Sequence, residues 1–169
     1  YEDLKDMANM DAVKAFRAHA LNPNAPAMRG SHENGDVFFQ HREACNSVYD
    51  ALPEVVCKYL AKVNAKLGTN YDLFNYYGAP DADRVIIAMG SVCDVAEEVV
   101  DYLNAHGEKV GLIKVRLYRP WVSEKFLSVL PKTVKKIAVL DRTKEPGSLG
   151  EPLYLDVATT LREAGLNDI

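Results

Sequence analysis

The stretch Arg84-Val85-Ile86-Ile87-Ala88-Met89-Gly90-Ser91 decides the fold of this 169-residue chain. Its continuous apolar run is typical of a strand that is buried on both faces of a sheet, so we predict a strand over Arg84–Met89. Gly90 and Ser91 turn the chain directly into a helix that ends at His106-Gly107. The apolar positions of that helix recur every three or four residues: Val92, Val95, Ala96, Val99, Val100 and Leu103.

The alternation of strand and helix continues to the end of the chain. Residues 109–117 and 136–141 have the pattern of two further strands, and Ser123 is a candidate cap for a short helix between them. Pro152 stands where the first turn of a last helix accepts a proline, and Gly165 ends that helix. Such alternation implies right-handed crossovers and a mostly parallel sheet with helices on both faces. The predicted class is therefore α/β.

The chain changes character at the turn cluster Gly78-Ala79-Pro80-Asp81. Before it, the spacing of apolar residues predicts a long amphipathic helix over Asn46–Leu67, with Gly68 as its left-handed stop. We therefore expect a helical and loop-rich extension over residues 1–80 and an α/β domain over residues 81–169.

Within the extension, Asp11 is a candidate cap for a short helix. Residues 22–36 are rich in Asn, Pro and Gly and are interpreted as a long loop, which is usually functional or crosses between domains. Val37-Phe38-Phe39 is interpreted as a short strand or an anchoring plug.

Charge and composition exclude several classes of function. The chain holds 20 Lys and Arg against 24 Asp and Glu, a net charge of −4. Residues 1–80 carry 8 basic and 10 acidic groups and residues 81–169 carry 12 and 14, so neither part has the basic footprint of a nucleic-acid binder. No apolar run approaches the roughly 20 residues of a membrane span. The sequence thus predicts neither nucleic acid nor membrane as a partner.

Cysteine usage indicates a reducing compartment. Cys45, Cys57 and Cys93 are odd in number and lack CxxC spacing, which argues against a disulfide framework or a four-thiolate zinc site. We therefore expect a cytoplasmic protein. His41 and Cys45 stand four residues apart, but without an orienting third group a catalytic thiol is disfavoured. The four histidines show no clear metal-ligand spacing, so no metal ligands are predicted.

The turn Gly90-Ser91-Val92 is the first candidate binding site. A strand that ends in Gly-Ser and opens a helix presents backbone N–H groups and a positive helix end at the carboxyl edge of the sheet. A phosphate or carboxylate would suit that edge. The alternative is that Gly90 only permits the turn and Ser91 only caps the helix.

The segment from Asp141 to Gly150 is the second candidate site. It follows a predicted buried strand at the same edge, and Arg142 and Lys144 are suited to hold an anion or a partner's carboxylate. The alternative is that its charged residues, which include Glu145, pair with each other across a domain boundary.

Residue types enriched at protein interfaces follow the strand at 109–117. Arg119 and Trp121 are candidates for contact with a neighbouring domain, together with Glu145 in the later loop. Trp121 fits burial in the domain core equally well.

Several long strings resemble the pyruvate:ferredoxin (flavodoxin) oxidoreductase family. The resemblance runs from about Asp11 to the C-terminus. Its most distinctive strings are Leu73–Ala82, Arg84–Ser91, Lys114–Trp121, Ile137–Gly147 and Glu151–Val157. The loop residues around Ser31-His32-Glu33-Asn34-Gly35, and His41, depart from the family wording.

The resemblance implies an internal slice of a large multidomain enzyme. The parent would oxidise pyruvate with coenzyme A to acetyl-CoA and carbon dioxide, using thiamine diphosphate, Mg²⁺ and [4Fe-4S] clusters. It would be a homodimer that passes electrons to ferredoxin or flavodoxin. Residues 1–80 would be the tail of its pyruvate-binding first domain. No position here matches a catalytic residue, a thiamine diphosphate-binding Gly-Asp-Gly or a CxxCxxCxxxCP cluster motif.

For residues 81–169 the resemblance implies three α/β/α layers with a five-stranded sheet, similar to the C-terminal domain of transketolase. Three strands are visible in the pattern, and the remaining two are expected around Val37 and Tyr71–Tyr77 or elsewhere.

Three functions compete on this basis. The leading hypothesis is a non-catalytic scaffold that contacts the other domains of the parent chain. The alternative is a module that binds coenzyme A or another phosphate-bearing ligand at Gly90–Val92, with Arg142 and Lys144 nearby. The third is a free-standing regulatory or nucleotide-binding α/β protein.

Overall fold

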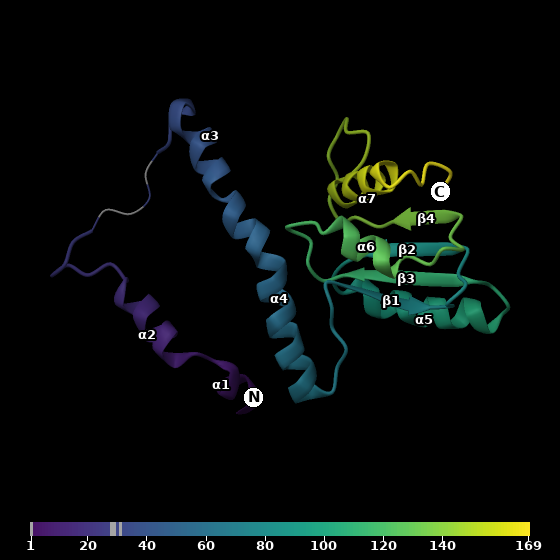
Figure 1. Ribbon diagram of the computed structural model, residues 1–169, viewed down its shortest axis with the longest axis horizontal. Coiled ribbons are helices and arrows are strands. Elements are labelled where there is room, and N and C mark those ends of the chain that lie inside the picture. Colours follow the sequence, from purple (N-terminus) through teal and green to yellow (C-terminus); the bar gives the residue numbers. More distant parts are fainter. Residues whose placement is uncertain (1, 28–29, 31) are drawn as a thin grey trace.

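A four-stranded sheet forms the centre of the computed structural model, which describes all residues except 1, 28–29 and 31. β2 is parallel to its neighbours β3 and β4, whereas β1 runs antiparallel to β3 at one edge. The predicted α/β class with a mostly parallel sheet is confirmed (Figure 1). In spatial order the strands are β1 (Phe74–Gly78), β3 (Val110–Val115), β2 (Arg84–Ala88) and β4 (Lys136–Val139).

Helices cover both faces of the sheet and so complete three layers (Figure 1). On one face lies α5 (Val92–Ala105), whose Cys93, Ala96 and Val100 pack on Ala88, Val110 and Leu112. On the other face lie α6 (Ser123–Val129) and α7 (Pro152–Glu163). The core beneath α6 and α7 includes Leu73, Phe74, Val85, Ile87, Ile113, Phe126, Leu153 and Val157.

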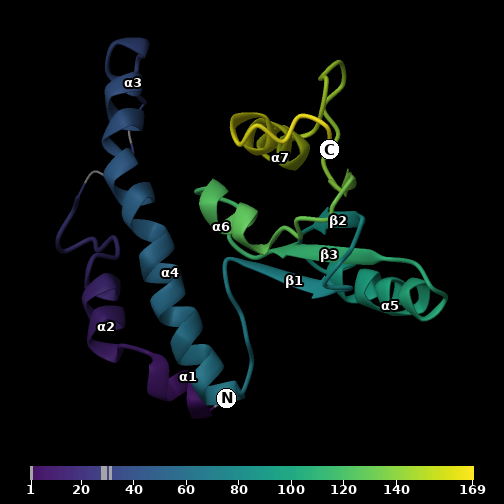
Figure 2. The same cartoon turned by 45° about the vertical axis from the view of Figure 1, so that its right-hand side comes forward.

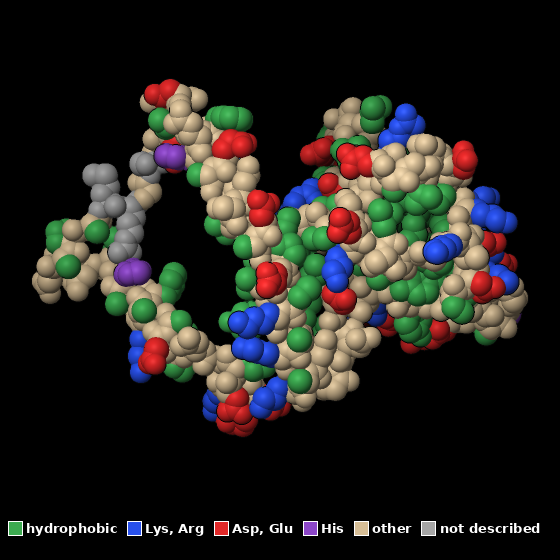
Figure 3. All heavy atoms as spheres, in the orientation of Figure 1, with side chains coloured by type: hydrophobic (Ala, Val, Ile, Leu, Met, Phe, Trp, Pro, Cys, Tyr) green, Lys and Arg blue, Asp and Glu red, His purple; other side chains and the backbone are tan. Residues whose placement is uncertain are grey.

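In the described part of the chain before the sheet lie four further helices: α1 (Glu2–Met7), α2 (Met10–Ala18), α3 (Gly35–Ala44) and α4 (Asn46–Leu67). Among their described residues, none is buried. α4 has the predicted bounds, and Gly68 ends it at φ 67°. Figure 3 shows hydrophobic side chains exposed along α2 and α4.

Two predictions for this extension were wrong. The cap of α2 is Asn9, whose side-chain oxygen accepts the N–H of Ala12 at 3.0 Å, because the helix begins before Asp11. Val37-Phe38-Phe39 is neither a strand nor a plug but part of α3, with Phe38 and Phe39 exposed. Three consecutive apolar residues do not distinguish a helical from a strand period, so the pattern was ambiguous there. The strand expected around Tyr71–Tyr77 is present as β1.

The extension is attached to the sheet at the C-terminal half of α4 (Figure 2). Val56, Cys57 and Leu60 pack against the core beneath α6 and α7. Asn64 adds a polar bracket: its side chain accepts the N–H of Tyr71 at 2.8 Å and donates to the carbonyl of Tyr71 at 2.9 Å. The end of α4 is thereby fixed to the segment that leads into β1.

The turn at residues 78–81 lies inside the sheet, between β1 and β2. The sheet thus begins on the N-terminal side of the predicted division at residue 80, and the division itself stays a prediction. Gly78 has φ 116°, and a Cβ on it would lie 2.6 Å from the carbonyl oxygen of Val110. Only glycine fits this close approach of the two strands.

Two predicted caps and one predicted stripe also differ from the structure. Ser91 stands at the N-cap of α5 with helical dihedrals and makes no capping bond. Ser123 is already inside α6, with Val122 at the cap, and its hydroxyl lies 3.1 Å from that of Thr160. On α5, Val95 and Val99 are 65% and 44% exposed, because the buried face is centred on Cys93, Ala96 and Val100 instead.

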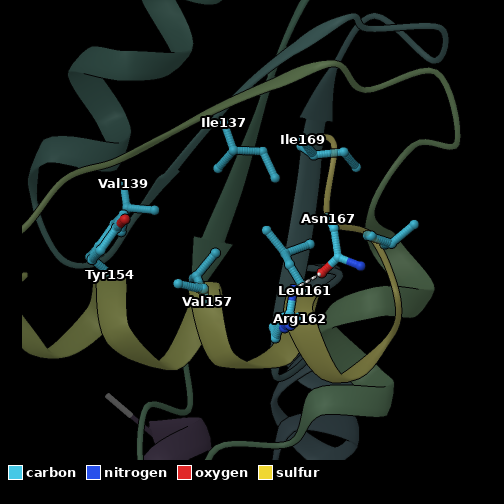
Figure 4. A pocket seen from close by; sticks show the side chains of 10 residues that line it. Ile137, Val139, Tyr154, Val157, Leu161, Arg162, Asn167 and Ile169 are labelled. Atoms are coloured by element: carbon cyan, nitrogen blue, oxygen red, sulfur yellow. Dashed lines mark hydrogen bonds between the residues drawn. The ribbon is translucent and has the colours of Figure 1, made fainter.

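β4 is an edge strand, and a hollow of about 270 Å³ lies between it and α7, lined by apolar side chains together with Arg162 and Asn167 (Figure 4). Ile137 lies on one side of this hollow, Leu161 on the other, and Ile169 at its end. Within the described residues, no helix combines the length and apolarity of a membrane crossing.

Candidate functional site

The two predicted binding segments follow neighbouring parallel strands. Gly90-Ser91-Val92 follows β2, residues 141–150 follow β4, and β2 and β4 pair in parallel register from Arg84↔Lys136 to Ile87↔Val139. The first segment leads to α5 on one face of the sheet and the second leads to α7 on the other. In open α/β sheets, ligands bind where adjacent connections part in this way. The carboxyl edge between β2 and β4 is therefore the candidate site.

A hollow of about 410 Å³ lies beside the β2–α5 turn. It is lined by Gly90, Ser91, Cys93, Asp94, Lys114, Val115 and Arg116. Gly90 has φ 79°, and nothing lies within 4 Å of the position of a Cβ, so glycine is required by the backbone and not by crowding. Lys114 was missed as a site residue by sequence reasoning. The available signal was its place near the end of β3, whose carboxyl end reaches the same edge.

The cations of this hollow already have partners inside the chain. Lys114 forms an ion pair with Glu97 of α5, and its amine lies 5.6 Å from the centre of the Tyr77 ring. Arg116 donates to the side-chain oxygen of Asn75 at 2.7 Å and stacks on the Tyr71 ring at 4.3 Å. An anion would have to compete with these contacts.

Cys93 lines the same hollow, but it is not poised to react. Burial, its largest influence, raises the pKa of the Cys93 thiol, and this outweighs the opposing effect of Lys114 and Arg116. The protonated thiol is a weak nucleophile and a poor metal ligand.

The loop after β4 is braced by its own polar groups. Asp141 accepts the N–H groups of Leu153 and Tyr154 at 3.4 and 3.2 Å, so its carboxylate occupies the N-terminus of α7. Glu151 accepts the Lys144 amine at 2.9 Å and the N–H of Glu145 at 2.8 Å. The bond from Lys144 is the main reason why the pKa of Glu151 lies below its ordinary value.

The loop and the start of α7 enclose a second hollow of about 460 Å³, with Asp141, Lys144 and Tyr154 in its lining. Arg142 is exposed, and among the described residues it forms no ion pair. Of the two predicted cations, Arg142 is therefore the one whose charge is not already neutralised inside the chain.

The three candidate interface residues have different surroundings. Trp121 packs between Phe74 and Phe126, with ring centroids 5.0 and 5.2 Å away, and its indole N–H donates to the Thr160 hydroxyl at 2.8 Å. Trp121 is partly buried against the core, and its role at an interface stays a prediction. Arg119 pairs with Asp156 of α7 at 2.7 Å. The Glu145 side chain is exposed in the loop.

The segment around His41 and Cys45 is not organised as a nucleophile and base. The imidazole of His41 contacts the Glu33 carboxylate at 2.6 Å, whereas the thiol of Cys45 donates to the backbone carbonyl of His41 at 3.3 Å. Glu33 and His41 are residues that depart from the family wording, and the structure brings them together. Ser31, in the same string, lies outside the described residues.

Comparison with known proteins gives a family and a set of much longer relatives. Residues 82–168 match the family model described as pyruvate:ferredoxin oxidoreductase core domain II. The chain is 60% identical over 157 residues to a pyruvate-flavodoxin oxidoreductase of Enterobacter agglomerans, covering 93% of this chain and 13% of that protein. It is 58% identical over 167 residues to a pyruvate:ferredoxin oxidoreductase of Moorella thermoacetica, covering 99% and 14%.

A third relative, a pyruvate-flavodoxin oxidoreductase of Nostoc, is 52% identical over 166 residues, covering 98% of this chain and 14% of that protein. The chain thus spans about one seventh of the length of these curated relatives. One solved structure, a 2-oxoglutarate:ferredoxin oxidoreductase from Magnetococcus marinus, aligns over 84% of this chain and 22% of its own. Its TM-score is 0.39 and its identity 20%, so nothing is inferred from it.

Proposed function

This chain belongs to the pyruvate:ferredoxin oxidoreductase core domain II family, and we propose that it serves as a non-catalytic interdomain segment of a pyruvate:ferredoxin (flavodoxin) oxidoreductase. The whole enzyme converts pyruvate and coenzyme A to acetyl-CoA and carbon dioxide and passes the electrons to ferredoxin or flavodoxin. It is a cytoplasmic homodimer in this proposal, and the segment positions the domains on either side of it.

The observation that carries the proposal is the pattern of coverage. Relatives that are 52–60% identical match 93–99% of this chain, while the chain matches only 13–14% of them. The candidate site agrees with a supporting role, because Lys114, Arg116 and Lys144 are each engaged by neighbouring side chains. The pair His41 and Cys45 is not arranged as a base with its nucleophile, since the His41 imidazole contacts Glu33 and not Cys45.

The described residues of this chain do not fit the metal centres of the proposed enzyme. Across the described residues, no group of three or more His, Cys, Asp or Glu is placed to hold a metal ion. Burial raises the pKa of the Cys93 thiol and so opposes the thiolate that an iron–sulfur cluster needs. In this proposal thiamine diphosphate, Mg²⁺ and the [4Fe-4S] clusters are held by other parts of the enzyme.

An activity comparison tests this role. The 169-residue chain and the full-length protein that contains it are assayed for pyruvate-dependent and coenzyme A-dependent reduction of a viologen dye. We expect turnover by the full-length protein and none by the chain alone. Turnover above blank by the chain would contradict the non-catalytic role, and an inactive full-length protein would contradict the proposed enzyme.

A second candidate function rests on the divergence of connections at the carboxyl edge. The exposed Arg142 and the N-terminus of α5 at Gly90-Ser91-Val92 follow adjacent strands, as expected of a site for the phosphates of coenzyme A or a similar ligand. The partners of Lys114 and Lys144 oppose this function, which is why it ranks second.

Amide chemical shifts of the ¹⁵N-labelled chain separate the two functions. Saturable shifts at residues 90–92 and 142–150 on titration with coenzyme A, lost in Ser91→Ala/Arg142→Ala, would establish the binding function. Arg162→Ala is the matched control, because Arg162 lies at the far end of α7 and pairs with Asn167 at 3.0 Å. Unchanged spectra would remove the binding function, and a parallel titration with thiamine diphosphate tests whether any response is specific.

A further inference from the structure

The outer face of α5 carries an apolar stripe that the chain itself does not cover. Val95, Val99 and Tyr102 are 65%, 44% and 62% exposed and lie three or four residues apart on the same side of the helix. The ring of Tyr102 extends the stripe toward His106, whose ring lies 4.2 Å away. The inner face of α5 is already buried on the sheet, so the fold of the domain does not need this stripe.

Acidic side chains accompany the stripe, and α5 has no basic residue. Glu97 and Asp101 are engaged inward, by the Lys114 amine and by the Tyr77 hydroxyl at 2.8–2.9 Å. Asp94 and Glu98 are exposed, and among the described residues neither forms an ion pair. The outer face of α5 therefore combines an apolar centre with uncompensated negative charge.

This face lies on the side of the sheet opposite α6 and α7 (Figure 1). The exposed apolar side chains of α4 belong to the other side, because α4 packs against the core beneath α6 and α7. A neighbour that covers α4 does not thereby cover α5. The molecule thus has two separate exposed apolar surfaces, one on α4 and one on α5.

We propose that the outer face of α5 is a second docking surface, and that its partner is an apolar protein surface flanked by Lys or Arg, carried by another domain of the same long chain. This inference rests on the proposed function. An apolar centre with a polar rim is usual at protein–protein interfaces, and the acidic side chains at this rim favour a basic partner over an acidic one. The segment then bridges two neighbours, one on each side of its sheet.

Carboxyl labelling of the full-length protein tests the proposal. The probe is glycine ethyl ester, coupled to exposed carboxylates by a water-soluble carbodiimide and located by mass spectrometry. We expect labelling of Asp94 and Glu98 to be severalfold lower in the full-length protein than in the 169-residue chain. The unfolded protein supplies the full-labelling reference. Equal labelling in the two folded proteins would overturn the proposal.

The same reagent without the added amine joins each carboxylate directly to a contacting lysine and so identifies the partner. Cross-links from Asp94 or Glu98 to a lysine outside this segment of the same chain support the proposal. Links between isotopically distinct copies would overturn it, because the partner would then be a second copy. Both readouts are independent of turnover, so an inactive full-length protein would contradict the enzyme assignment without deciding the docking surface.

A variant pair checks that the stripe itself makes the contact. Val99→Lys places a cation on an exposed position, so the isolated chain is expected to keep its stability, while in the full-length protein Asp94 recovers the labelling of the free chain. Leu155→Lys, at a 42% exposed position on α7, is the matched control and should leave Asp94 protected. Unchanged protection of Asp94 in Val99→Lys would overturn the role of the stripe.

Discussion

The helices before residue 69 and the α/β layers after residue 72 differ in how far they bury their apolar side chains. None of the described residues of α1 to α4 is buried, and the large apolar side chains of Phe16 and Phe39 are each more than two-thirds exposed. After residue 72, each face of the sheet has its own apolar cluster. Both regions contain amphipathic helices, so the difference does not come from helix patterning. An apolar stripe on a helix therefore indicates that the helix packs against another surface, but it does not indicate which part of which chain provides that surface.

The largest expected difference between the two regions comes from removing one phenylalanine side chain from each. Phe126 is fully buried and Phe16 is 78% exposed. We expect Phe126→Ala to lower the free energy of unfolding by about 3–5 kcal/mol. Phe16→Ala should change it by less than about 0.5 kcal/mol. Urea unfolding followed by circular dichroism measures both. Equal losses would mean that Phe16 is buried in solution by another surface.

A pair of glycine substitutions makes the same contrast in the backbone. Gly78→Ala forces a side chain into a left-handed position 2.6 Å from the Val110 carbonyl, so we expect a loss of about 1–3 kcal/mol. Gly35→Ala, at the open first position of α3, should be neutral or stabilising by up to about 1 kcal/mol. Thermal unfolding of both variants is the measurement, and a stable Gly78→Ala would argue against the close β1–β3 approach.

The link between the two regions is testable at the Asn64 bracket. Asn64→Ala removes its bonds to both backbone groups of Tyr71, and we expect a cost of about 1 kcal/mol. The effect should be local. Hydrogen exchange is expected to speed up for Tyr71 and the last turn of α4, while amides of β2 keep their protection. Asn70→Ala, next in the connecting segment, is the control. Faster exchange in β2 would show that the bracket supports the whole sheet.

Acid should act on the α/β region through its ion-paired carboxylates. Lys109 donates a hydrogen bond to Asp81 and Arg84 donates one to Asp83, which holds the pKa of each carboxyl below its ordinary value of 3.8. Their stabilisation is present above that value and is lost as the pH falls through the lower pKa of the folded state. Because all these groups are exposed, the effect is small. Lys109→Gln should flatten the dependence of the urea midpoint on pH below 4, and Lys132→Gln should leave it unchanged.

The strands and helices that sequence patterns located best are those with long, unambiguous periods. β2, β4 and α4 lie where the pattern placed them, and Gly68 and Pro152 have the expected roles. β1 could be placed only by the resemblance, because its pattern is short and mixed. The short apolar run at Val37 had no period, and it is helical although none of the described residues of α3 is buried.

The position of the candidate site could be predicted from the sequence, but the partners of its charged side chains could not. The carboxyl edge follows from the order of strands and turns, which the sequence pattern reveals. The partners of its charges come from distant residues: Glu97 for Lys114, Asn75 for Arg116, and Glu151 for Lys144. Spacing along the chain does not report such pairs, so the cations looked more available than they are.

The carboxylate of Asp141 at the N-terminus of α7 has a consequence for any anion that approaches the edge after β4. A tethered group competes at an effective concentration in the millimolar range or above, set by the short span of chain that holds it. A free phosphate at lower concentration would find the N-terminus of α7 already occupied by the Asp141 carboxylate. Asp141 thus competes with free anions at the N-terminus of α7, whereas Ser91 makes no capping bond at the N-terminus of α5.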